Sequence, residues 1–99
     1  MIIMEINITH DKKYQQFTAS LGNDEEAKLA YATPEPDVLN FTHTFVPESA
    51  RGKGIANKLI EEGLCYAEQN GLQVVATCPV VQKFIQKNPD YHRLLKSDS

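Results

Sequence analysis

The stretch that most constrains the fold of this chain runs from His43 to Ala56. It begins as the end of an extended apolar segment, passes through a polar turn that contains Pro47, and enters a helix through a glycine-containing sequence at residues 51–54. Glycines at a helix entry place no Cβ between the backbone N–H groups and an approaching anion. The first helical turn adds unpaired N–H donors and the positive end of the helix dipole. The stretch therefore predicts a strand, a phosphate-binding turn and a helix, in that order.

Length and composition exclude several other classes of protein. The 99 residues, 41% of them hydrophobic and 23% charged, fit a single domain over residues 1–99 with one core. A net charge of −3 argues against a general nucleic-acid binder. The first residues lack the basic start and long apolar run of a signal peptide or membrane span. The cysteines, Cys65 and Cys78, form no disulfide framework, and no metal-ligand spacing joins them to the histidines. We therefore expect a reduced, cytoplasmic protein that binds no metal, nucleic acid or membrane.

Three extended segments precede the central stretch. They span residues 2–8, 14–20 and 27–33. The connections between them are short and polar, and the first covers only about residues 10–13. Because short connections join antiparallel neighbours, these segments predict an antiparallel meander. A rigid turn at residues 34–37 leads into the fourth strand.

The fourth strand and the following helix have the clearest patterns. The strand is predicted over residues 38–46, with Leu39, Phe41, His43 and Phe45 on one face. After the glycine turn, apolar residues recur at helical spacing as far as position 67. Cys65 lies beside this apolar stripe, and we interpret it as a packing residue.

The last third predicts one more strand and one more helix. Gly71 stands where a left-handed helix cap belongs. Residues 74–76 are apolar without alternation, as in a strand covered on both faces. Pro79 favours a helix start and Pro89 a helix end, with one further turn at 91–95 and a frayed tail from Lys96. A strand, a helix and a strand in this order predict a parallel crossover unit.

One motif in the turn is typical of a known family. Arg51, Gly54 and Ala56 occupy the defining positions of the pattern Gln/Arg-x-x-Gly-x-Gly/Ala. With the strand before it and the strand that ends at Cys78 and Pro79, the chain resembles a minimal member of the GNAT superfamily of N-acetyltransferases. The resemblance implies an α+β fold, with a mixed sheet made of the meander, the βαβ unit and a C-terminal helix. Larger GNAT enzymes carry helices between the first two strands that help form the acceptor site, and this chain has none there.

The resemblance also implies which residues bind coenzyme A. The turn would hold the pyrophosphate, and backbone groups at the end of the fourth strand would pair with the pantetheine arm. The cofactor-binding residues are then Phe45, Val46, Arg51, Gly52, Lys53, Gly54, Ile55 and Ala56.

Three residues are candidates for catalysis. His43 is a candidate because imidazole side chains change charge near neutral pH, which suits removal of a proton from an attacking amine. Cys78 precedes a helix start that favours thiolate, so it is either a polar wall or a nucleophile. Tyr91 is a candidate proton donor to the cofactor sulfur. Each has a structural alternative: a hydrogen-bonded histidine, a buried inert thiol and a packed tyrosine.

Three functions remain open from the sequence. The first is transfer of an acetyl group from acetyl-CoA to an amine, acting as a monomer or weak homodimer. The short first connection predicts an open acceptor side, which favours a bulky acceptor such as a protein lysine or N-terminus. The second is a coenzyme A-binding module without catalysis, and the third is an interaction domain that keeps only the fold.

Overall fold

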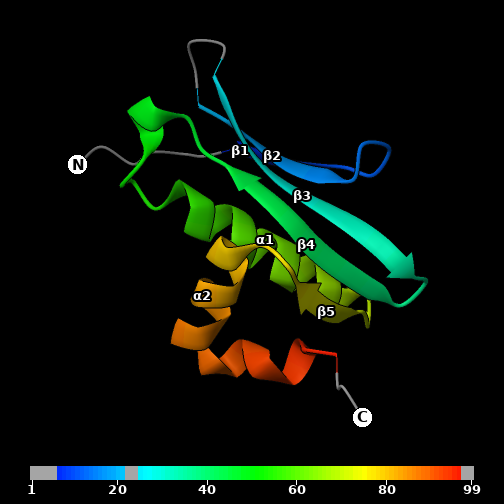
Figure 1. The fold of residues 1–99 in the computed structure, drawn as a ribbon. Helices are drawn as coiled ribbons and strands as arrows, with labels where there is room; N and C mark the ends of the chain where they lie inside the picture. The colour runs from blue at the N-terminus through cyan, green and yellow to red at the C-terminus, as the bar shows by residue number, and fades with distance from the viewer. Residues whose placement is uncertain (1–6, 22–24, 97–99) are drawn as a thin grey trace.

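The computed structural model describes residues 7–21 and 25–96, which form a mixed sheet with helices on one face (Figure 1). The elements are β1 (Asn7–Asp11), β2 (Gln16–Ser20), β3 (Glu26–Glu35), β4 (Val38–Phe45), the 3₁₀ helix η1 (Glu48–Ala50), α1 (Ile55–Gln69), β5 (Gln73–Ala76), α2 (Pro79–Lys87) and the 3₁₀ helix η2 (Pro89–Leu94). The strands lie in the order β1-β2-β3-β4-β5. β1 to β4 are antiparallel neighbours, and β4 and β5 are parallel. The predicted meander, crossover unit and final helix are confirmed.

The core lies between the sheet and α1. The apolar stripe predicted for this helix is buried and packs on inward-facing residues of β2, β3 and β4. α2 and η2 pack beside α1, and α2 adds Val81, Phe84 and Ile85 to the same core. We call this side of the sheet the helix-covered face. The opposite side, which carries no helix in the part of the chain that the structure describes, is the helix-free face (Figure 1).

Gly63 allows α1 to lie close against the sheet. A Cβ at this position would lie 2.7 and 2.9 Å from ring atoms of Phe41 and 3.1 Å from the Leu29 side chain. Both neighbours are fully buried and have little room to move. We therefore expect Gly63→Ala to lower the free energy of unfolding by about 1–3 kcal/mol, although alanine has the better helix propensity by about 1 kcal/mol. Urea unfolding measures the change.

The matched control is the exposed neighbour Glu62 on the same helix. Glu62→Ala should leave the urea midpoint almost unchanged, because it removes no buried contact. If Gly63→Ala were as stable as the wild type, α1 would be free to shift away from the sheet, and the packing argument would be wrong.

The predicted helix ends are confirmed. Gly71 has a φ of +66°. Its N–H donates to the Glu68 carbonyl at 3.3 Å, and that of Leu72 donates to the Ala67 carbonyl at 2.8 Å. This is the pattern of a Schellman cap, so α1 ends where the glycine predicts. Pro79 opens α2, and that helix ends before Pro89.

The first hairpin differs from the prediction because a polar-looking residue packs inward. The His10 ring stacks on Phe17 at 4.2 Å, meets Tyr66 edge-on at 4.4 Å and hydrogen-bonds the Tyr31 hydroxyl. These contacts extend β1 to Asp11, where a connection was predicted. The turn is therefore confined to residues 12–15, and β2 starts at position 16 rather than 14. The predicted start of the first strand, residues 2–6, lies outside the described residues.

Three other predictions about the strands and the C-terminal end are wrong. β3 continues through Pro34 as far as Glu35, where a turn was predicted, because Glu35 still pairs with β4. β5 is an edge strand and Val75 is half-buried, so this strand is not covered on both faces. Lys96 is not frayed: its N–H donates to the Val74 carbonyl at 2.9 Å and its Nζ lies 2.8 Å from Glu35 Oε1. Residues 97–99 lie outside the described part of the chain.

Candidate active site

The geometry of the site begins with a bulge in β4. His43 pairs with Ala30, whereas Phe41 pairs with the next residue of β3, Tyr31. Thr42 is therefore an extra residue on β4 without an opposite number. An extra residue interrupts the alternation of side chains between the two faces of the sheet. The residues after it therefore face the opposite way from the one that unbroken alternation would give.

The bulge changes the faces of the last β4 residues. Thr44 lies opposite the inward-facing Leu29, so its side chain is on the helix-covered face. His43 and Phe45 point to the helix-free face, where Phe45 lies opposite Lys28. The prediction that His43 and Phe45 share the face of Phe41 is therefore wrong.

Beyond the bulge, β4 and β5 separate. Their last pair is Phe41 and Ala76, and the N–H groups of Thr77 and Cys78 both donate to the Phe41 carbonyl at 3.1 Å. Residues 43–45 remain paired with β3 on one side. On the other side, no described backbone group bonds them. We call this opening, between the end of β4 and the start of α2, the wedge.

Cys78 stands at the wedge on the helix-covered face. It is the N-cap residue of α2 and is 4% exposed, and its Sγ lies 3.4 Å from Thr44 Oγ1. Burial raises the pKa of the Cys78 thiol. The Thr44 hydroxyl and the backbone N–H groups of Val81, Val80 and Thr44 favour the thiolate, and their sum brings this pKa below its usual value. The donors around the Cys78 sulfur therefore outweigh the effect of its burial on the thiol pKa.

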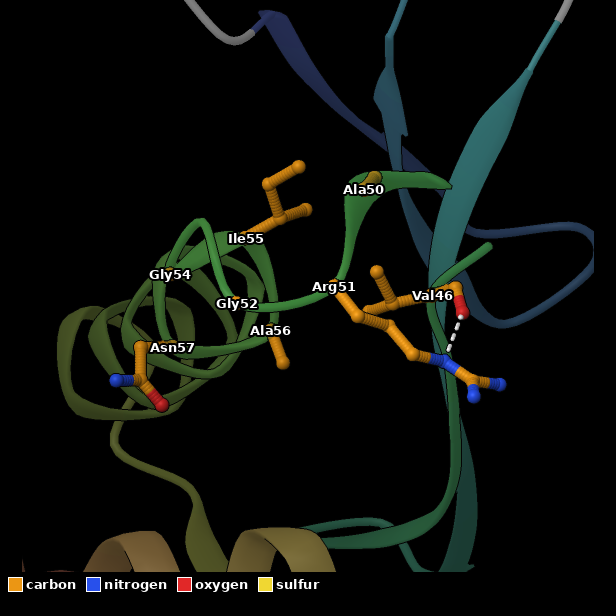
Figure 2. A pocket seen from close by; sticks show the side chains of 8 residues that line it. All are labelled: Val46, Ala50, Arg51, Gly52, Gly54, Ile55, Ala56 and Asn57. Atoms are coloured by element: carbon orange, nitrogen blue, oxygen red, sulfur yellow. Dashed lines mark hydrogen bonds between the residues drawn. The ribbon is translucent and has the colours of Figure 1, made fainter. Parts of the chain in front are cut away.

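A pocket of about 260 Å³ lies at the turn before α1 (Figure 2). It is lined by Val46, Ala50, Arg51, Gly52, Gly54, Ile55, Ala56 and Asn57. Gly52 and Gly54 have φ values of +82° and +75°, which favour glycine. A Cβ at either position would meet no protein atom within 4 Å. The turn therefore leaves its backbone open towards the surrounding space.

The start of α1 presents unpaired donors to this pocket. The first helical bond runs from the Lys58 N–H to the Gly54 carbonyl at 3.1 Å. No side chain caps the helix, and its first turn carries no acidic residue. The N–H groups of Ile55, Ala56 and Asn57 therefore have no acceptor among the described residues. Together with the helix dipole, they form an anion site.

Arg51 spans the pocket. Its side chain reaches from the turn to the end of β4, where Nε donates to the Val46 carbonyl at 3.2 Å (Figure 2). The two terminal nitrogens of the guanidinium have no hydrogen-bond or ion-pair partner in the described parts of the chain. One bond thus fixes the position of the side chain and leaves a forked donor for an anion.

The structure brings together six of the eight residues predicted for cofactor binding. Lys53 does not line the pocket, and Phe45 lies at the end of β4 beside the wedge. Ala50 and Asn57 line the pocket but were missed by the sequence analysis. Asn57 stands in the first turn of the helix that follows the glycines, so helical spacing could have predicted its place beside the pocket. No sequence signal marks Ala50, because the 3₁₀ helix η1 places it at the pocket and no pattern predicts a 3₁₀ turn there.

The three catalytic candidates are not gathered at one point. The side chain of His43 is exposed on the helix-free face and makes no hydrogen bond or ion pair with any described residue. Tyr91 packs on Phe84, with ring centroids 5.7 Å apart, and lines a cavity beside Cys65. No hydrogen bond within the described residues joins Tyr91 to Cys78. Cys65 itself is exposed, so the prediction that it packs is wrong.

No three or more His, Cys, Asp or Glu side chains in residues 7–21 and 25–96 come together as a metal site. Over the same ranges, no helix has the length and apolar character needed to cross a membrane.

Comparisons with known proteins agree with this geometry. The pattern of the GCN5-related N-acetyltransferases matches residues 16–94. The chain belongs to this family, and the predicted GNAT resemblance is confirmed. It is 35% identical to Protein NATD1 of Bos taurus over 85 residues, which are 85% of this chain and 75% of that protein. It is 34% identical to Protein NATD1 of Danio rerio over 89 residues, covering 89% and 81%.

A solved structure has the same fold. It is the solution structure of a GCN5-like protein from Staphylococcus aureus, with a TM-score of 0.73 and 21% sequence identity. The likeness covers 94% of this chain and 90% of that one. It confirms the predicted α+β fold.

Proposed function

We propose that this protein transfers an acetyl group from acetyl-CoA to an amine. The observation that carries the proposal is that an anion pocket and an unpaired strand edge lie next to each other on one strand–turn–helix unit. Coenzyme A has a pyrophosphate at one part and amide groups along its pantetheine arm, so it matches both features. Membership of the GCN5-related family supports the same activity.

Each part of the site has a role in this proposal. The N–H groups of Ile55, Ala56 and Asn57 and the guanidinium of Arg51 hold the pyrophosphate. The free edge of residues 42–45 pairs with the amides of the pantetheine arm, like one more strand. Because the pocket is smaller than most ligand pockets, it accounts for only one part of the molecule.

The wedge supplies the chemistry. Its backbone donors at the end of β4 polarise the thioester carbonyl. His43, on the helix-free face, removes the proton from an amine that approaches from that side. Cys78, on the helix-covered face, forms the opposite wall. Direct transfer is the route that this division favours: the amine nitrogen bonds the acetyl carbon, the carbon–sulfur bond breaks, and coenzyme A leaves as a thiolate that takes up a proton from water. An acetyl-cysteine on Cys78 is the second route.

The acceptor side supports a bulky amine. The β1–β2 connection covers only residues 12–15, so no helix from it screens the helix-free face beside His43. A lysine on a protein surface or a chain N-terminus fits such an open approach. We propose these acceptors over a small metabolite, which would gain little from a site without an enclosing wall.

Two measurements test the function. Calorimetric titration should show that acetyl-CoA and coenzyme A bind, and thiol release should then follow with lysine peptides and N-terminal peptides. His43→Ala should slow turnover by about 10²–10⁴-fold with binding unchanged, which is the usual contribution of a general base. Binding without thiol release would favour the alternative, a coenzyme A-binding module. Turnover of a small amine by a monomer, with none on peptides, would contradict the proposed acceptor.

A further inference from the structure

The groups around the Cys78 sulfur decide how readily this thiol ionises. Cysteine nucleophiles often lie beside a histidine, whose imidazolium favours the charged sulfur. Here the bulge separates the two groups. His43 points to the helix-free face, while Cys78 and Thr44 lie on the helix-covered face. No Cys–His pair is built at the wedge.

The groups around the sulfur are hydrogen-bond donors. Thr44 Oγ1 lies 3.4 Å from Sγ, and this is its only hydrogen bond within the described residues. The N–H groups of Thr44, Val80 and Val81 favour the thiolate as well, and no charged side chain contributes to the shift in the thiol pKa. Once the thiol is ionised it can only accept, so the Thr44 hydroxyl is then the donor in this pair.

We propose that Thr44 is the positioning residue of the site: the bulge at Thr42 turns its hydroxyl to the helix-covered face, 3.4 Å from the Cys78 sulfur, where it orients this sulfur at the wedge and favours its ionisation. Without the extra residue, alternation would place Thr44 on the helix-free face, away from Cys78. The bulge thus does two things with adjacent residues. It places the His43 imidazole on the helix-free side of the wedge. It places the Thr44 hydroxyl on the helix-covered side, beside the Cys78 sulfur.

Any effect of Thr44 on turnover rests on the proposed acetyltransferase function, whereas the test of the Thr44–Cys78 contact does not. The protonation state of Cys78 is measured on the protein alone, without coenzyme A. Failure of the proposed function would appear as absent thiol release, whereas failure of this proposal would appear in the titration of the thiol.

The experiment uses a Cys65→Ser background, in which Cys78 is the only thiol. Alkylation by iodoacetamide is followed by mass spectrometry across a range of pH, and thiolate absorbance gives the pKa directly. Thr44→Val keeps the shape and strand preference of threonine but removes the hydroxyl. We expect it to raise the pKa of the Cys78 thiol and to slow alkylation near neutral pH by roughly three- to tenfold, since the thiolate loses a hydrogen-bond donor. Thr44→Ser should restore the wild-type profile.

Two controls isolate the effect. Thr77→Val removes the hydroxyl of the residue next to Cys78, which bonds Asn40 Oδ1 at 3.3 Å and not the sulfur. It should leave the thiol titration unchanged, and so should His43→Ala. An unchanged pKa in Thr44→Val would overturn the proposal. So would a shift in His43→Ala as large as that in Thr44→Val, because it would place the imidazole beside the sulfur.

Discussion

Gly54→Val is expected to abolish coenzyme A binding. At a φ of +75°, the glycine exposes the N–H groups that follow it, and its Cβ direction opens into space that holds no protein atom. A branched side chain there would occupy the place that the pyrophosphate needs. It would also strain the turn, since β-branched residues avoid this backbone region. Loss of two or more charge-assisted hydrogen bonds corresponds to an affinity decrease of over ~100-fold. Titration calorimetry measures it.

Gly71→Val is the matched control. Gly71 has a similar φ of +66° and an equally open Cβ direction, but it caps the far end of α1. This variant should lose stability by a similar amount and bind coenzyme A normally. If Gly54→Val stayed folded and bound with wild-type affinity, the pyrophosphate site would lie elsewhere. If both variants lost binding equally, the effect would be one of stability and not of the pocket.

The predictable parts of this fold are those with a local chemical cause. Gly54 and Gly71 adopt backbone conformations that other residues avoid, and Pro79 and Pro89 favour and oppose helix at fixed positions. Each of these residues acts within its own segment. The turn, the cap and the ends of α2 were therefore visible in the sequence, and so was most of the pocket lining.

The parts that were missed depend on distant partners. His10 looks like the start of a polar connection, but the aromatic rings of β2, β3 and α1 enclose it and extend the strand. Lys96 looks like part of a tail, but it bonds β5 and Glu35. Neither effect leaves a pattern in the neighbouring residues, because the contacts are made in the tertiary structure.

The bulge at Thr42 is the most consequential of these omissions. The run from Thr42 to Phe45 alternates polar and aromatic side chains in a way that fits an unbroken strand. The pairing with β3 leaves Thr42 as the extra residue, and this bulge reverses the faces of His43 and Thr44. His43 and Cys78 stand out in the sequence as candidates, but no sequence pattern places them on the two sides of the wedge.

Coenzyme A is expected to protect Cys78 from alkylation. Cys65 is exposed and Cys78 is buried. Access therefore favours labelling of Cys65, while the lowered pKa favours labelling of Cys78, so the order of labelling does not test the site. Protection does test it. With coenzyme A at about 100 times its Kd, labelling of Cys78 should slow by over ~10-fold. The exposed Cys65 is the internal control and should be labelled at an unchanged rate.

Cys78→Ala then decides between the two routes. If Cys78 is a wall and the amine attacks directly, as the opposite placement of His43 favours, the variant should retain turnover within about tenfold of the wild type. If an acetyl-cysteine forms, the variant loses the group that carries the acetyl, and the rate should fall by over ~10³-fold. Cys78→Ser separates these cases from a packing defect, because it keeps the size of the side chain. A low rate in the alanine and serine variants alike, with normal unfolding and coenzyme A affinity, would establish the covalent route and contradict direct transfer.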